Sequence, residues 1–159
     1  MSDVHPLTSR LVDFLNASPT PFHAVAVVAK ALLARGFRPI ALADVVEPLP
    51  VGTKGFVAES GSIFAFHVGT APVEEAGFRI VAAHTDSPNL RIKPQPLVRS
   101  HGYVRLGVEV YGGVQIPTWV DRDLGMAGFV HLRDESVASG FRTELVDIRR
   151  PLCRIPTLA

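Results

Sequence analysis

The sequence predicts an α/β fold that continues into a β-rich segment, and three observations support this. Apolar residues recur at helical spacing up to Arg35. Strand-forming runs replace them between residues 55 and 83, with turn residues between the runs. After Pro94 only short β-like runs remain, punctuated by glycines. Two helices followed by several strands are the usual opening of an α/β or α+β domain.

Two helices are expected first. Apolar side chains at helical spacing predict a helix over Leu7–Asn16, which Ser18-Pro19 should end. A second helix is predicted over Phe22–Arg35. Thr20 is a good N-cap for it, and Pro21 suits its first turn, where a missing N–H costs nothing. Gly36 should end this helix in the left-handed conformation.

Strands follow the helices. Gly55–Glu59 and Ser62–Val68 flank Ser60-Gly61 and predict a hairpin. The mostly apolar run Phe78–Ala83 predicts an interior strand that is covered on both faces. This strand should deliver the chain to His84-Thr85-Asp86.

Pro94-Gln95-Pro96 reads as a stiff connector and a domain boundary. We therefore expect residues 1–93 to be the first part of an α/β domain and residues 94–159 to be the first part of a β-rich domain. Strands are predicted in the second part at four runs: Tyr103–Tyr111, Ile116–Val120, Met126–Arg133 and Phe141–Ile148.

Composition excludes several classes of protein. With 47% hydrophobic and 19% charged residues, the chain can bury a core and is not disordered. A formal net charge of +1 excludes a strongly basic nucleic-acid binder. One cysteine, Cys153, excludes a disulfide scaffold and favours a reducing compartment. The longest apolar stretch, 24–34, contains Lys30 and is shorter than a membrane span, and no secretory signal is visible, so we expect a soluble cytoplasmic protein.

The strongest chemical signal is His84-Thr85-Asp86 at the end of the predicted apolar strand, where open α/β sheets place ligands. A neutral imidazole binds zinc well, and a nearby carboxylate fixes its tautomer and raises its basicity. Asp86 and Ser87 are also common turn residues, and His84 fits a hydrogen-bonded position at a strand end. A zinc site needs three or four ligands. The spacing alone therefore favours the turn interpretation and keeps the zinc interpretation open.

Two acidic groups are weaker candidates. Asp121 and Asp123 surround Arg122 and are either metal ligands or part of an ion pair that holds a turn. We favour the structural interpretation, a buried Asp–Arg pair. Glu74-Glu75 lies in a polar connector, where a solvated loop is the better interpretation.

Several motifs coincide in order and spacing, and they extend over essentially the whole chain. They are Asn16-Ala17-Ser18-Pro19-Thr20-Pro21-Phe22-His23-Ala24-Val25, the segment from Ala83 to Pro94 with His84-Thr85-Asp86-Ser87-Pro88, Gly107 to Gly113, Thr118-Trp119-Val120-Asp121-Arg122-Asp123-Leu124, and Arg150 to Pro156. Together they strongly resemble the M18 family of metallo-aminopeptidases, the aspartyl aminopeptidases.

The resemblance implies a cytosolic zinc exopeptidase that removes N-terminal residues, often acidic, from peptides. It implies a two-metal α/β catalytic domain and an inserted β-rich domain that builds a homo-oligomer. His84 matches the first metal-binding histidine of the family. Asp86 matches the supporting aspartate of the catalytic site, which orients that histidine.

Other ligands of the family belong to a segment that this chain lacks, and Thr157 stands where the family usually has histidine. One matched ligand does not make a two-metal site. We therefore expect the N-terminal portion of a zinc-dependent aminopeptidase, a chain that is inactive by itself. The alternative is a non-catalytic remnant that binds a peptide or a protein partner. Neither nucleic acid nor a membrane is expected as a partner.

Overall fold

The computed structural model describes residues 5–44 and 47–157. Contacts divide the chain into two compact units. The first unit comprises Met1–Thr85 and Ala127–Asp147, and the second comprises Asp86–Met126 and Ile148–Ala159. The predicted domain ranges, 1–93 and 94–159, refer to the domains of a longer protein, and they stay a prediction. Their ends at 1–4 and 158–159 lie outside the described residues.

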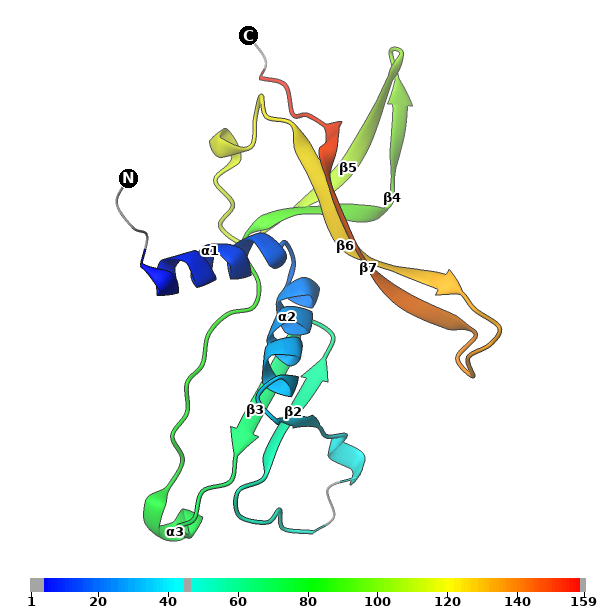
Figure 1. Ribbon diagram of the computed structural model, residues 1–159. Coiled ribbons are helices and arrows are strands. Elements are labelled where there is room, and N and C mark those ends of the chain that lie inside the picture. Colours follow the sequence, from blue (N-terminus) through cyan, green and yellow to red (C-terminus); the bar gives the residue numbers. More distant parts are fainter. Residues whose placement is uncertain (1–4, 45–46, 158–159) are drawn as a thin grey trace. The chain divides into compact units, whose positions relative to one another are not determined.

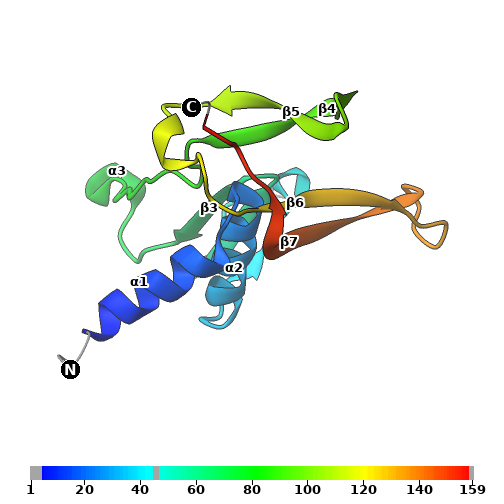
Figure 2. The ribbon, with the colours of Figure 1, turned by 90° about the horizontal axis from the view of Figure 1, so that it is seen from above.

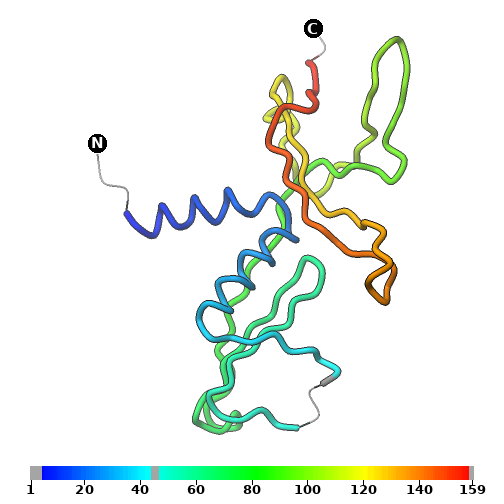
Figure 3. The backbone as a smooth tube through the Cα atoms, turned by 45° about the vertical axis from the view of Figure 1, so that its right-hand side comes forward, coloured from blue at the N-terminus to red at the C-terminus, as the bar shows by residue number. Residues whose placement is uncertain are grey.

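The first unit opens with two helices, α1 (Pro6–Ala17) and α2 (Pro21–Leu33), where the sequence predicts them (Figure 3). Thr20 is the N-cap of α2, and its side chain accepts a hydrogen bond from the backbone N–H of His23 at 3.4 Å. The helix ends just before Gly36, which has a φ of 79°. A left-handed residue at this point suits glycine because it has no Cβ.

A small sheet packs with α2. It has the order β1-β2-β3, with β1 (Arg38–Pro39) parallel to β2 (Lys54–Glu59) and β2 antiparallel to β3 (Ser62–His67). Ser60 and Gly61 form the turn of the predicted hairpin, which is confirmed (Figure 1). The most buried apolar side chains among the described residues are Ala24, Val25 and Phe56. The core of this unit therefore lies between α2 and β2.

The predicted strand Phe78–Ala83 is not a strand in this structure. The run is without regular structure, and none of the strands formed by the described residues pairs with it (Figure 1). Phe78 is 77% exposed and Val81 is 99% exposed. An interior strand needs hydrogen-bonding neighbours at its edges and layers over its faces. The described residues supply neither, so the expectation of a covered strand was wrong for this chain.

The second unit contains a hairpin of β4 (Asn89–Ser100) and β5 (Tyr103–Tyr111). The strand β5 has the predicted bounds. Pro94-Gln95-Pro96 is not a connector but lies inside β4, where the register shifts between Ile92 and Leu97. Proline has no N–H to donate to a strand ladder, so the pairing is interrupted there and resumes beyond it.

Ile116–Val120 was predicted as a strand and is not one. A short 3₁₀ helix, η2 (Ile116–Thr118), occupies most of it. Pro117 removes a strand donor and its fixed φ suits a helical turn. Two other short elements, η1 (Leu42–Asp44) and α3 (Val73–Ala76), lie in the first unit.

A long hairpin of β6 (Leu124–Arg133) and β7 (Phe141–Cys153) completes the fold (Figure 2). Both strands were predicted, although β7 continues past the expected end at Ile148. The boundary between the two units crosses both strands. In the first unit, the ring of Phe22 in α2 packs edge-on against Phe129 of β6, with 4.6 Å between centroids.

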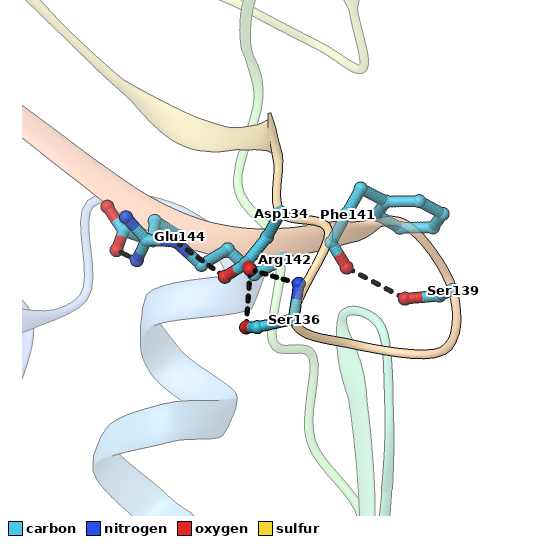
Figure 4. Close-up of polar contacts among 6 residues, drawn as sticks. All are labelled: Asp134, Ser136, Ser139, Phe141, Arg142 and Glu144. Carbon is cyan, nitrogen blue, oxygen red and sulfur yellow. Dashed lines mark hydrogen bonds and ion pairs between the residues drawn. The ribbon is translucent and has the colours of Figure 1, made fainter.

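Side chains of the connection 134–140 close this hairpin (Figure 4). The Asp134 carboxylate accepts hydrogen bonds from the N–H and hydroxyl of Ser136, at 3.0 and 2.6 Å. Arg142 lies 3.4 Å from the other oxygen of Asp134 and also pairs with Glu144. The two hydrogen bonds from Ser136 lower the pKa of Asp134, because they favour its ionised form. The turn is thus held by polar contacts on an exposed tip.

No helix within the described residues has both the length and the apolar character needed to cross a membrane.

Candidate functional site

His84 and Thr85 follow the unpaired run and end the first stretch of the first unit. His84 is exposed and Thr85 is half-buried. The Thr85 hydroxyl donates to the backbone carbonyl of Gly61 at 2.6 Å. This bond attaches the residue between His84 and Asp86 to the turn of the β2–β3 hairpin. This hydrogen bond therefore fixes the position of Thr85 relative to the β2–β3 hairpin, whose turn lies 24 residues earlier in the chain.

Asp86 begins the second unit and is half-buried. The Tyr111 hydroxyl donates to its Oδ2 at 2.5 Å. This bond, and the negative charge of the carboxylate, raise the pKa of Tyr111 above its ordinary value of 10.0. The Arg91 guanidinium lies over the tyrosine ring, 3.5 Å from its centroid. Asp86 is thus held by a side chain from the far end of β5.

Gly112 explains how the chain leaves Tyr111 so close to Asp86. Its φ is 68°, and a Cβ at this position would lie 3.4 Å from Cγ of Pro88. The backbone of Gly112 therefore adopts a left-handed conformation and also passes close to Pro88. A glycine meets both demands.

Tyr111 and Arg91 also belong to this site, although the local sequence pattern did not predict them. The register of the hairpin, in which Asn89 pairs with Tyr111 and Arg91 with Glu109, brings them to the same end of the β4–β5 ladder. The signal was available in part, because Tyr111 directly precedes the Gly112-Gly113 pair. The pairing partner is long-range and is not visible in the local pattern.

A zinc ion suits part of this chemistry. His84 has an imidazole, and Asp86, two residues later in the sequence, has a carboxylate. Zinc centres use both kinds of group. Residues 5–44 and 47–157 contain no group of three or more His, Cys, Asp or Glu side chains that could hold a metal ion. Within those residues the chain offers one predicted ligand and its supporting carboxylate, not a complete ligand set.

Asp121 and Asp123 have structural partners. The Asp121 carboxylate accepts from the N–H and the hydroxyl of Thr157, at 3.1 and 2.6 Å. Asp123 pairs with Arg154 at 2.6 Å, and both side chains are 56% exposed. The structural interpretation of this block is supported, but the expected buried pair was wrong, because the observed ion pair is exposed and its cation is 31 residues away. The neighbouring arginine, Arg122, donates to the backbone of Thr118 instead.

The remaining polar candidates lie elsewhere. His23 is buried and its Nδ1 is 2.7 Å from the Thr20 hydroxyl. His131 has its Nδ1 2.9 Å from the Thr143 hydroxyl. Glu74 and Glu75 are exposed on the single turn of α3. Each of these groups has a structural or solvent-facing position.

Comparison with known proteins identifies the family. The model of the aminopeptidase I zinc metalloprotease family (M18) matches residues 14–159. A probable M18 family aminopeptidase 2 of Streptomyces coelicolor is 48% identical over 152 residues, which are 96% of this chain and 33% of that protein.

Solved structures agree with this match. A cryo-EM structure of the Ape4 and Nbr1 complex superposes with a TM-score of 0.85 at 42% identity, over 95% of this chain and 29% of the other. An S. cerevisiae mApe1 dodecamer gives a TM-score of 0.78 at 26% identity, over 96% and 36%. The chain spans about a third of the length of the proteins it matches. Its mixed α/β fold follows that of M18 aminopeptidases, and the chain belongs to the M18 family of zinc metallo-aminopeptidases.

Proposed function

We propose that this chain is the N-terminal portion of a zinc-dependent aminopeptidase that removes N-terminal residues, acidic ones foremost, from peptides in the cytoplasm. The observation that carries the proposal is the His84-Thr85-Asp86 segment, anchored by Thr85 and Tyr111, in a chain that the family model matches from residue 14 to 159. The 48% identity to a third of the probable M18 family aminopeptidase 2 of Streptomyces coelicolor supports the proposal that the whole protein has this activity.

In this proposal His84 is a metal ligand, and Asp86 orients its imidazole by accepting a hydrogen bond from the ring N–H. The bound zinc would activate water and polarise the peptide carbonyl. Asp86 is therefore a positioning residue for the ligand. Thr85 contributes by attaching the segment to the turn at Gly61.

The rest of the ligand set, and the general base, come in this proposal from a part of the enzyme outside this chain. The described part leaves the apolar run at 78–83 uncovered. We therefore expect the isolated chain to have no peptidase activity. Residues 1–93 would belong to the catalytic domain and residues 94–159 to the inserted β-rich domain.

A homo-oligomer is part of the proposal. The similarity to the S. cerevisiae dodecamer supports it. The alternative is a non-catalytic module that binds a peptide or a protein partner. The exposed apolar side chains of the run at 78–83 favour this alternative, because exposed apolar surface is common at interaction sites.

A chimera tests the proposed function. This chain replaces the matched 152-residue segment of the Streptomyces relative, and the product is assayed with zinc on peptides that begin with Asp, Glu or Leu. We expect turnover that a chelator removes, fastest on the acidic peptides. His84→Asn should abolish it, whereas the matched control His101→Asn, at the exposed β4–β5 turn, should leave it intact.

The isolated chain is assayed in parallel with zinc. Chelator-sensitive turnover by it would contradict the expected inactivity. A chimera that binds no zinc, or one that keeps full activity with His84→Asn, would contradict the assignment of His84 and favour the binding module.

A further inference from the structure

We propose that Tyr111 is a positioning residue of the aminopeptidase site: its hydroxyl holds the Asp86 carboxylate in place, while Arg91 holds the tyrosine ring. The inference rests on the proposed function of Asp86 and adds to it two residues from another part of the chain.

The hydrogen bond is the first observation. The Tyr111 hydroxyl donates to Oδ2 of Asp86 at 2.5 Å, across 25 residues of sequence. Hydrogen bonds from a hydroxyl to a carboxylate are short, and they are stronger than bonds between neutral groups. Both residues are half-buried and belong to the second unit. The carboxylate is therefore restrained by the β4–β5 hairpin as well as by its own backbone.

The position of the ring is the second observation. Tyr111 is the last residue of β5, and its partner in register is Asn89, so Arg91 is its diagonal neighbour across the pair. The Arg91 guanidinium stacks on the ring at 3.5 Å from the centroid. A cation at this distance is attracted to the face of the ring, which favours the orientation seen here. The hydroxyl thus reaches Asp86 from a defined direction.

The backbone beside Tyr111 is the third observation. Gly112 turns with a positive φ against Pro88, whose Cα, Cβ and Cγ are all within 3.5 Å of the place a Cβ would occupy. The chain segments that carry Asp86 and Tyr111 are therefore packed together immediately beyond the hydrogen bond.

The consequence concerns the histidine. A carboxylate that accepts a hydrogen bond from a ligand imidazole sets the tautomer and orientation of the ring, and loss of such a partner lowers metal affinity about 10- to 100-fold. Tyr111 does not contact the histidine in this proposal but acts on it through Asp86. Its removal should therefore have the same kind of effect as the loss of Asp86, at the lower end of that range.

The test uses the zinc-loaded chimera defined above. Zinc affinity is measured by competition with a chromophoric chelator, and thermal unfolding of the metal-free protein shows that each variant is folded. Tyr111→Phe removes only the hydroxyl and should weaken zinc binding about tenfold. Asp86→Asn should weaken it at least as much. The double variant should bind zinc no more weakly than Asp86→Asn alone, since the tyrosine acts only through that carboxylate. The control is Tyr103→Phe, the other tyrosine of the chain, which is 73% exposed at the opposite end of β5 and should change nothing.

Two results overturn the inference. The first is wild-type zinc affinity in Tyr111→Phe; if that variant also unfolds earlier in the metal-free form, the residue is merely structural. The second is a double variant whose loss of zinc-binding free energy equals the sum of the two single losses. Failure of the proposed function is distinguishable, because then the unsubstituted chimera holds no zinc or His84→Asn leaves zinc affinity unchanged.

Discussion

The β2–β3 hairpin and the run at 78–83 contain similar strand-forming residues, yet only the first forms a sheet. In the hairpin, Phe56 pairs with Ala65 across the ladder and is 4% exposed beneath α2. In the run, Val81 is 99% exposed and unpaired by any strand of the described residues. An apolar, β-branched sequence favours extended backbone in both places. Only a neighbour at hydrogen-bonding distance turns that preference into a strand.

The largest expected effect tests this contrast directly with two phenylalanines. Phe56→Ala should lower the free energy of unfolding by about 3–5 kcal/mol, because it removes a buried ring and leaves a cavity. Phe78→Ala, at a side chain that is 77% exposed, should change it by less than about 0.5 kcal/mol. Urea denaturation followed by circular dichroism measures both. Equal losses at the two positions would mean that the run at 78–83 is covered in solution.

A second pair of substitutions compares two glycines near the hairpin. A Cβ on Gly55 would collide with Cδ1 of Ile40 and with the Phe66 ring, whereas nothing lies within 4 Å of a Cβ on Gly69. Gly55→Ala should destabilise the chain by about 1–3 kcal/mol through overpacking. Gly69→Ala should be close to neutral. The urea concentration at the midpoint of unfolding is measured for both variants. An unchanged midpoint for Gly55→Ala would show that the sheet can shift to make room for the Cβ.

A smaller effect is expected at the helix that covers the hairpin. Thr20→Ala removes the hydroxyl that caps α2 and that lies 2.7 Å from Nδ1 of His23. Loss of such a cap costs about 1 kcal/mol. Thr53→Ala, which removes a hydroxyl that donates to a backbone carbonyl in a turn, provides the comparison. Thermal unfolding should rank Thr20→Ala as the more harmful of the two.

The smallest effect concerns the second unit, which has none of the buried apolar residues identified among the described ones. Hydrogen bonds from Thr157 hold the pKa of Asp121 below its ordinary value of 3.8. The folded state therefore favours the ionised form, so the stabilisation is fully present above about pH 4 and disappears as the pH falls through the lowered pKa. Asp121→Asn should flatten this part of the pH profile of stability. An unchanged acid limb would show that the contact between Asp121 and Thr157 is absent in solution.

Parts of the fold and site were accessible from local sequence. Thr20, Pro21 and Gly36 gave the bounds of α2 within about two residues, because caps and breakers act within one helical turn. The turn at Ser60-Gly61 gave the β2–β3 hairpin for the same reason. Pro94 and Pro96 were misinterpreted, since the sequence shows a missing donor but not the bulge that accommodates it. At the site, His84 and Asp86 were visible as a pair, and their proposed roles came from the resemblance to a family.

The sequence by itself determined the family, the two helices, the tight turns and the segment that carries the candidate chemistry, because each depends on residues close together in the chain. Only the tertiary structure decided that Tyr111 reaches Asp86, that Thr85 is tied to Gly61, that Arg154 pairs with Asp123, and that the run at 78–83 stays uncovered. These features depend on strand register and on contacts 24 or more residues apart. Local preference sets the conformation a segment can adopt, whereas burial and partners arise only when distant segments pack together.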